Sequence, residues 1–365
     1  MFRSKKMRAC VRCAAFLCIF FVIAGAAGGV LGEKNAEMLS ARYFEEPAGT
    51  HDIVFLGPST IMNGVYPLLL WDRFGYTAYN LGAGNETAEA SYYLAKRAIK
   101  QDHPKLIVMD CGLLRKEKVI DSVNFLHFVT DRMPALCAER WELLARSALE
   151  GRPSLGALAG LCFPILEYHS RWDGITAEDF EESEKTVTYG AKVDARSMTA
   201  EPELFAPVKA DADASLPEHS ERTLRELIAL CRETDTGLVL VTMPTLAATK
   251  YIGQGTYEER AESAAAVKKI ADELGVPYIN MFDDGSAFGL SLEDDTVEGF
   301  HLNVTGAEKF TQYMGTYISE TFDIDDRRDD PKYRHFDEAY AAFRDYVLEK
   351  TGRDLTQRAK GGSAA

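Results

Sequence analysis

The sequence predicts a three-layer α/β/α sandwich, in which helices cover both faces of a central parallel five-stranded sheet. Short apolar runs of strand length recur along the chain, and patterns of helical spacing lie between several of them. The predicted strands cover residues 52–56, 77–81, 105–110, 237–243 and 277–281. Continuously apolar strands that alternate with helices are typical of a parallel sheet that is buried on both faces.

The helices are predicted from the spacing of their apolar residues. The clearest patterns cover residues 89–100, 218–232, 258–274 and 336–348. Near the C-terminus, Thr305 and Glu308 have the spacing of a capping box, which predicts that another helix begins at Gly306. The loop before this helix carries Glu298 and His301, and side chains on such a loop can be both rigid and exposed.

A long stretch interrupts the alternation of strands and helices. Residues 113–217, between the third strand and the helix before the fourth, are irregular and contain many aromatic residues. We expect this insertion to lie over the sheet as a lid or substrate-binding subdomain. Residues 34–322 then form the main domain, and residues 323–365 form a charged C-terminal helix and tail.

The first 33 residues form a basic stub followed by an apolar segment. Lys and Arg residues at positions 3–12 precede the uncharged run 13–31. This run approaches the roughly 20 residues that cross a bilayer as a helix, and its basic flank predicts a cytoplasmic N-terminus. A cleaved signal peptide is the alternative, because Ala24-Gly25-Ala26 offers small residues for cleavage. Both interpretations place the main domain outside the cytoplasm, and the first attaches it to the membrane.

Composition excludes some classes of function. The formal net charge of −15 argues against a nucleic-acid partner. The seven cysteines and seven histidines form no cluster with the spacing of a zinc site, so no metal and no cofactor are predicted.

Residues that follow the strands are the candidates for chemistry, because ligands bind at the carboxyl ends of the strands in an open parallel sheet. Ser59 follows the first strand, and His301 and Glu298 precede the last helix of the main domain. A serine, a histidine and a carboxylate on separate elements suit acyl transfer, since the histidine takes the serine proton and the carboxylate orients the imidazole. A helix cap is the alternative role for Ser59.

Several stretches together resemble the SGNH (GDSL-like) hydrolase superfamily. They are the serine turn after the first strand, the Asn-Leu-Gly turn after the second and the acid-x-x-His pattern near the C-terminus. "FLGPST", "YNLGAGNETAEASYYLAKRAIK", "PKLIVMD", "HFVTDRMP", "YHSRWD" and "GFHLNVTGAEKFTQYMGTYI" are similar to membrane-anchored bacterial SGNH-like proteins. That group is related to the D-alanine-transfer protein of lipoteichoic acid modification and to alginate O-acetylation proteins. The similarity covers most of residues 50–322.

The resemblance implies a flavodoxin-like SGNH fold and a role for each motif. Ser59 would be the nucleophile, His301 the base and Glu298 the orienting acid, with the Ser59 and Gly82 backbones as oxyanion donors. Glu298 stands where an aspartate is usual, so either Asp294 or Asp295 is an alternative acid.

Two departures from the superfamily pattern concern the oxyanion site. Gly-Pro-Ser replaces the usual Gly-Asp-Ser, and Asp110-Cys111-Gly112 lacks the asparagine expected after the third strand. Asn85, or a polar group from the insertion, could replace that asparagine.

The insertion contributes candidate substrate contacts. His127 with Asp131, and His169 with Arg171, either form structural ion pairs or face the cleft and hold an anionic or polyhydroxyl substrate. Trp172 either stacks on a sugar ring or belongs to the core.

The resemblance implies an extracytoplasmic, serine-dependent esterase or acyltransferase that forms an acyl-enzyme. Its expected substrate is an acylated cell-envelope glycan, and its expected partner is a membrane acyltransferase. The alternative is an inactive scaffold that binds polysaccharide or assembles an acylation complex. A lipid or small-ester hydrolase is a third interpretation, which would need an apolar acyl pocket.

Overall fold

The five predicted strands form one parallel sheet in the computed structural model of the chain, which describes residues 2–31, 41–120, 123–176, 188–197, 214–244, 257–281, 288–297 and 301–356. The strands are β1 (Ile53–Leu56), β2 (Ala78–Asn80), β3 (Leu106–Asp110), β4 (Gly237–Thr242) and β5 (Tyr278–Asn280). Their order is β2-β1-β3-β4-β5, and every neighbouring pair is parallel. The predicted fold class is therefore confirmed.

The order of the strands determines where a ligand can bind. From β1 the chain moves outward to β2, and it then returns to the other side of β1 as β3. At such a switch point the connections leave the sheet in opposite directions, which opens a crevice at the carboxyl ends of β1 and β3. The turns that begin at Gly57 and Asp110 lie at this crevice.

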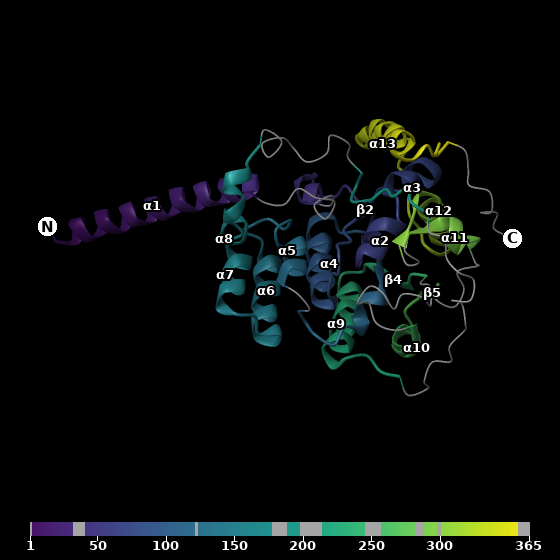
Figure 1. Cartoon of the computed structure of the whole chain (residues 1–365), viewed down its shortest axis with the longest axis horizontal. Coiled ribbons are helices and arrows are strands. Elements are labelled where there is room, and N and C mark those ends of the chain that lie inside the picture. The colour runs from purple at the N-terminus through teal and green to yellow at the C-terminus, as the bar shows by residue number, and fades with distance from the viewer. Residues whose placement is uncertain are drawn as a thin grey trace.

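The predicted helices are also confirmed, and they pack in two groups. The helices of the main fold are α2 (Ser59–Gly64), α3 (Pro67–Phe74), α4 (Ala88–Asp102), α9 (Glu218–Glu233), α10 (Tyr257–Leu274), α12 (Val304–Thr321) and α13 (His335–Thr351). α3 packs against α12 and α13, whereas α4 packs against α9 (Figure 1). The C-terminal helix α13 thus extends the helical layer that α3 and α12 form.

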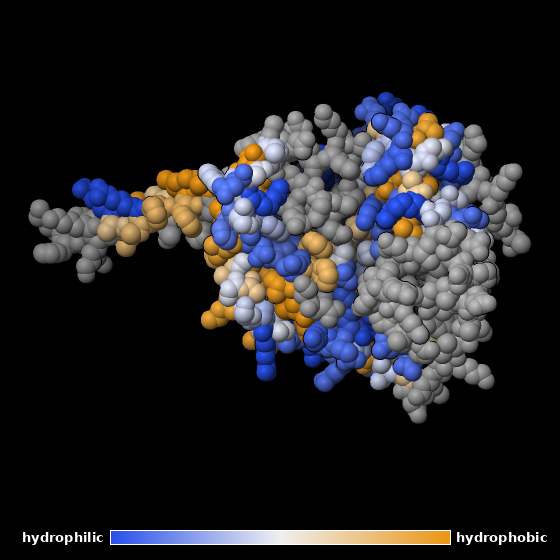
Figure 2. Space-filling view, viewed as in Figure 1, coloured by the Kyte–Doolittle hydropathy of each residue, from blue (hydrophilic) through white to orange (hydrophobic). Residues whose placement is uncertain are grey.

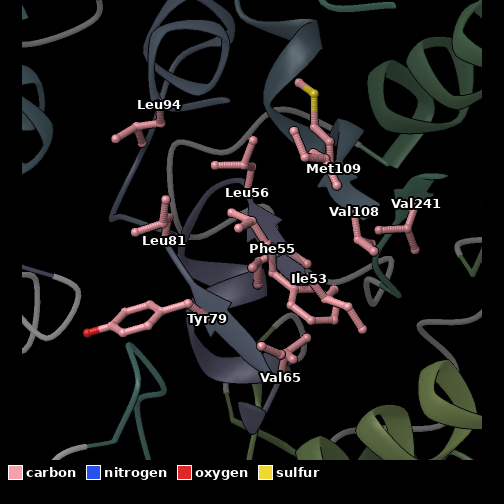
Figure 3. Packing of buried hydrophobic residues seen from close by; sticks show 14 of the residues in the cluster. Ile53, Phe55, Leu56, Val65, Tyr79, Leu81, Leu94, Val108, Met109 and Val241 are labelled. Carbon is pink, nitrogen blue, oxygen red and sulfur yellow. The ribbon is translucent and has the colours of Figure 1, made fainter. Parts of the chain in front are cut away.

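The core consists mainly of strand residues and the helix residues that cover them. Ile53, Phe55 and Val108 are fully buried, and Val65 and Leu94 pack from the helical layers (Figure 3). Full burial of a side chain of this size contributes about 1.5–3 kcal/mol. The sheet that positions the candidate site therefore rests on an apolar core, which is independent of the polar residues at its edge.

The N-terminus of α12 differs from the predicted capping box. The cap is Asn303, whose side chain accepts hydrogen bonds from the backbone N–H groups of Thr305 (3.0 Å) and Gly306 (3.2 Å), so the helix begins at Val304. Glu308 is fully buried and its carboxylate binds two arginine side chains, those of Arg73 and Arg353. Since both arginines come from other elements, the local pattern could not show that Glu308 has tertiary partners.

The insertion is mainly helical, and it packs beside the sheet domain. Its elements are η3 (Cys111–Arg115), α5 (Val123–Thr130), α6 (Ala138–Arg146), η4 (Ser147–Gly151), α7 (Leu155–Cys162), α8 (Ile165–Tyr168) and η5 (His169–Gly174). α6 packs against α4, so these helices widen one helical layer. Arg132 of the insertion donates through Nη1 to the Gly82 carbonyl at 3.5 Å, and residues 188–197 return to the edge of the sheet at the switch point.

The N-terminal helix α1 (Phe2–Leu31) extends away from the rest of the molecule (Figure 1). Large apolar side chains such as Phe16 and Ile19 are exposed along it, and Figure 2 shows apolar residues on the surface of this helix. Its C-terminal end packs against α8, where Arg171 Nη1 donates to the Leu31 carbonyl at 2.6 Å. Within the described residues, no helix combines the length and apolarity needed to cross a bilayer.

Candidate active site

The turn after β1 holds Ser59 at the carboxyl edge of the sheet. Gly57 has a φ of +141°, and a Cβ at this position would lie 2.8 Å from the Asp110 Cβ. A side chain would thus be both strained and obstructed, so the turn requires glycine. Pro58 then starts α2 in extended conformation, and half-buried Ser59 is the first helical residue.

His301 reaches Ser59 from the other end of the chain. Its Nε2 lies 2.7 Å from the Ser59 Oγ, although the two residues are 242 positions apart. His301 opens β7 (His301–Leu302), which pairs with the antiparallel β6 (Thr296–Val297) just before α12 begins. The hairpin and the capped helix fix the imidazole beside the hydroxyl, at the distance of a nucleophile and its general base.

The surroundings of His301 keep its imidazole neutral. Burial lowers the pKa of His301 to about 3, the cations Lys192, Arg196 and Arg260 act in the same direction, and Asp194 opposes them. A neutral imidazole whose Nδ1 carries the proton has a free electron pair on Nε2, which faces the Ser59 hydroxyl. His301 is therefore in the protonation state that a general base needs.

The orienting acid is the least defined part of the predicted triad. Glu298 lies outside the described residues. Asp295 is buried and bound to Lys309 Nζ (2.7 Å), while exposed Asp294 accepts a hydrogen bond from Ser291 Oγ (3.0 Å). Both alternative acids are thus engaged in local structure, and Glu298 stays the predicted partner of His301.

The segment 188–197 brings further charge to the site. It carries Lys192, Asp194 and Arg196, all of which act on His301, and Asp194 also pairs with Arg196 at 2.6 Å. Sequence reasoning missed these residues, because they lie in the irregular part of the insertion. The sequence did contain one sign of them: after Tyr189-Gly190, every second residue is charged, with alternating sign.

Backbone hydrogen bonds hold this segment across the switch point. The Tyr189 carbonyl accepts from the Asn80 N–H (3.0 Å), and the Lys192 N–H donates to the Met62 carbonyl (2.9 Å). Gly190 has a φ of +84°, and a Cβ there would lie 1.8 Å from the Asn80 carbonyl oxygen. The segment thus bridges the end of β2 and the nucleophile helix α2, with glycine at the closest approach.

The predicted oxyanion donors are only partly in place. The Gly82 N–H donates to Asn80 Oδ1 at 3.0 Å, so this donor is engaged inside its own turn. Asn80 also donates through Nδ2 to the Ile61 carbonyl at 2.8 Å, which ties the second turn to α2. The Ser59 N–H belongs to the first residue of a helix and has no acceptor within that helix. It is therefore the better placed of the two predicted donors.

Asn85 lies where the turn after β2 meets the insertion. Its backbone is left-handed, with a φ of +51°, and its carbonyl accepts a hydrogen bond from Lys116 Nζ at 2.7 Å. Asn85 lines a small pocket with Val119, Phe125 and other residues of the insertion. The substitution of Asn85 for the missing oxyanion asparagine stays a prediction.

Asp110 occupies the end of β3, where the superfamily pattern places its glycine and asparagine. It is buried, its Oδ2 accepts from Thr60 Oγ1, and its Oδ1 accepts from the Gly112 N–H at 2.8 Å. Burial raises the pKa of Asp110, whereas these hydrogen bonds lower it. The carboxyl group thus joins the turn after β3 to the residue that follows Ser59.

The five insertion residues expected to bind substrate lie elsewhere. His127 is buried and pairs with Asp131 (2.9 Å), His169 is exposed and bonds to the Leu166 carbonyl (2.7 Å), and Arg171 contacts the end of α1. Trp172 is exposed on η5, which follows α8 and lies far from α2 (Figure 1). The helical insertion packs on α4 and α1. His127 and Asp131 form the structural ion pair, whereas His169 and Arg171 each bond to a backbone carbonyl.

The residues that the structure describes contain no group of three or more His, Cys, Asp or Glu side chains that could hold a metal ion.

Comparisons with known proteins give a limited result. No family model matches the chain, and no curated protein matches it. Among solved structures, the chain is similar to a GDSL-like lipase from Bacteroides thetaiotaomicron (9% identity, TM-score 0.37, 74% of this chain and 88% of that chain). It is also similar to an acetyl xylan esterase (12%, 0.37, 73% and 98%) and to a catalytic mutant of an acetylxylan esterase from Geobacillus stearothermophilus (12%, 0.36, 76% and 97%).

Proposed function

We propose that this protein is a serine-dependent esterase or acyltransferase, with Ser59 as nucleophile and His301 as general base. The observation that carries the proposal is the 2.7 Å approach of His301 Nε2 to Ser59 Oγ. It occurs at the switch point of a parallel sheet, where ligands bind in this architecture.

The first step forms an acyl-enzyme. Ser59 Oγ attacks the ester carbonyl carbon while its proton moves to His301 Nε2, and the carbonyl oxygen becomes an oxyanion. The Ser59 N–H can donate to this oxyanion. When the tetrahedral intermediate collapses, the ester bond breaks and the leaving alcohol takes the proton from His301. The acyl group then remains on Ser59, and His301 is neutral again.

The second step releases the acyl group. Water or a sugar hydroxyl loses its proton to His301 Nε2 and attacks the acyl-enzyme carbonyl. The second tetrahedral intermediate then collapses, the bond between the acyl carbon and Ser59 Oγ breaks, and Ser59 Oγ takes the proton back from His301. The product is a free acid when water attacks and a new ester when a sugar hydroxyl attacks. Hydrolysis and transfer thus use the same residues and differ in the acceptor.

The substrate and location are proposed from the sequence. The basic stub and apolar run of residues 1–33 support a site outside the cytoplasm. The resemblance to envelope-modifying proteins supports an acylated cell-envelope glycan as substrate, with a membrane acyltransferase as partner. Attachment to the membrane through the N-terminal helix is part of the same proposal.

Covalent labelling tests the nucleophile. The protein is incubated with a fluorophosphonate and its intact mass is measured, beside Ser59→Ala and His301→Ala. We expect one adduct on the wild type and none on either variant, because the phosphonyl group bonds to Ser59 Oγ as fluoride leaves. Ser319→Ala and His335→Ala are matched controls, since both side chains are exposed and bond only to nearby carbonyls in their own helical turns.

A folded wild-type protein that forms no adduct would contradict the proposal. It would favour the binding or assembly role, which the engaged Gly82 N–H and the absence of an asparagine after β3 also favour. An adduct that persists in Ser59→Ala would place the reactive hydroxyl elsewhere.

A further inference from the structure

A second feature of the site is a pocket that adjoins Ser59 on the side of β3 and β4. It is formed by the turn after β1, by η3, by the end of β4 and by the first half of α10. Its lining includes Pro58, Thr60, Asp110, Arg115, Arg260 and Ser263. Because Pro58 and Thr60 are the two neighbours of Ser59 in the chain, a molecule in this pocket would lie next to the nucleophile.

Two guanidinium groups from different elements line this pocket. Arg115 is the last residue of η3, and Arg260 lies in the first turn of α10. The pKa of Arg260 is lowered to about 10, because burial and the nearby charge of Arg115 outweigh the opposing effect of Asp110. Arg260 thus remains charged at neutral pH, and both guanidinium groups line the same pocket. An oxyanion bound between them would interact favourably with both charges.

Asp110 lines the same pocket as the two arginines. Its two oxygens already accept hydrogen bonds from Thr60 and from the Gly112 N–H, and burial raises its pKa. Among the described residues whose charges act on His301, Lys192, Arg196 and Arg260 are cationic and Asp194 is anionic, whereas the chain as a whole has a formal charge of −15.

We propose that Arg115 and Arg260 form a subsite for an oxyanion, a carboxylate or a phosphate ester, carried by the substrate next to the ester that Ser59 attacks. This inference rests on the proposed function. A guanidinium is planar and always charged, and it binds both kinds of oxyanion through paired N–H groups. The subsite selects substrates with an anionic substituent near the acyl group over neutral esters of the same size.

Calorimetric binding at constant ionic strength tests the subsite without any turnover. The probes are inorganic phosphate and methyl glucuronoside, with neutral methyl glucoside for comparison. We expect the wild type to bind at least one anion more tightly than the glucoside. Arg115→Gln and Arg260→Gln should each weaken that binding roughly 10-fold or more, as the loss of a charge-assisted hydrogen bond predicts. The preferred anion distinguishes a phosphate substituent from a carboxylate.

Two further variants keep the result interpretable. Arg344→Gln removes the same charge from a partly exposed position on α13, where Arg344 pairs with Asp345, and it should bind the anion as the wild type does. Arg260→Lys keeps the charge but loses the paired N–H groups, and it replaces Arg260→Gln if that variant does not fold. We expect intermediate affinity from Arg260→Lys.

The position of the subsite is tested by protection of Ser59. The bound anion should slow fluorophosphonate labelling of the wild type at least several-fold, and it should protect the arginine variants less. Equal binding of both anions and the glucoside, or arginine variants that bind like the wild type, would overturn the subsite. If Ser59 is never labelled, the proposed function fails, while calorimetry still decides whether the arginines bind an oxyanion.

Discussion

The two ends of strand β1 each have a histidine within hydrogen-bond distance of a partner. At the amino end, His51 Nδ1 lies 2.9 Å from Asp102 Oδ2, and both side chains are fully buried. The rings of Tyr43 and Tyr79 surround this pair. At the carboxyl end, half-buried His301 faces the hydroxyl of Ser59.

The difference lies in what surrounds each histidine. Asp102 also accepts hydrogen bonds from the N–H groups of Gly49 and Thr50. Although burial raises the pKa of Asp102, His51 and its other donors lower it overall, so the carboxylate is ionised. His301 instead has a nucleophile as partner and a pocket nearby. The fully buried histidine that pairs with an acid is therefore structural. The histidine that lies beside a nucleophile and near an open pocket is the candidate for catalysis.

The largest expected effect, on turnover, comes from removing either member of the Ser59–His301 pair at the carboxyl end of β1. Ser59→Ala and His301→Ala should each lower kcat/KM for p-nitrophenyl acetate by roughly 10³-fold or more, because either change removes the machinery for attack. His51→Ala should leave kcat/KM of the folded protein near the wild-type value. Turnover in His301→Ala within 10-fold of the wild type would show that another base serves Ser59.

The next effect, on stability, comes from breaking the His51–Asp102 pair at the amino end of β1. His51→Ala leaves Asp102 buried without its imidazole partner, which should lower the free energy of unfolding by roughly 3–5 kcal/mol. Urea titration followed by circular dichroism measures this loss. The control is Lys268→Ala, at an exposed position on α10. It removes an ion pair with Asp272 and should lower the free energy of unfolding by under about 1 kcal/mol. Equal losses in both variants would contradict a structural role for His51.

The pH dependence of turnover sharpens the contrast. Since burial lowers the pKa of His301 to about 3, its neutral, basic form persists well below the usual value of 6.5. At pH 5 about 3% of an ordinary imidazole would be neutral, so His301 should retain roughly 30-fold more activity there than an unperturbed histidine. A rate profile between pH 4 and 9 checks this, and an acid limb with a midpoint near 6.5 would contradict it. Lys192→Gln should move the acid limb upward.

A further effect, on the pH dependence of stability, concerns Glu86, which lies close to the nucleophile turn. Burial raises the pKa of Glu86 to about 8, although the Ser91 hydroxyl and the Gly57 N–H lower it. The unfolded carboxyl loses its proton near 4.5, so the contribution of Glu86 to stability is highest below that pH. It then falls by about 1.4 kcal/mol per pH unit until the folded group also ionises near pH 8.

Glu86→Gln removes this slope, because the amide does not titrate. Urea unfolding is measured at pH 5, 6.5 and 8. The free energy of unfolding of the variant should increase relative to that of the wild type as the pH rises. As a control, Glu320→Gln at an exposed position should show the same change in the free energy of unfolding with pH as the wild type does. A constant difference between Glu86→Gln and the wild type at all three values would show that Glu86 is ionised throughout.

The sequence predicted the sheet and the Ser59–His301 candidates because both depend on local patterns. Apolar runs mark the strands, and parallel topology brings residues after the strands to one edge. The sequence did not predict the partners of those residues. Asn85 and Arg171 looked suitable by chemical type, yet they contact Lys116 and Leu31. A side chain's partners depend on how its element packs, and the irregular insertion carries no period from which packing could be inferred.

The sequence by itself determined the five parallel strands, the helices between them, and a serine and a histidine at the ends of separate elements. Only the tertiary structure decided that Ser59 and His301 meet, and that Arg115, Arg260 and Lys192 surround them with positive charge. The physical reason is the distance along the chain over which each kind of interaction acts. Periodicity and capping act over a few residues, whereas the charge at the site is assembled from η3, α10 and the segment 188–197, which lie far apart in the chain.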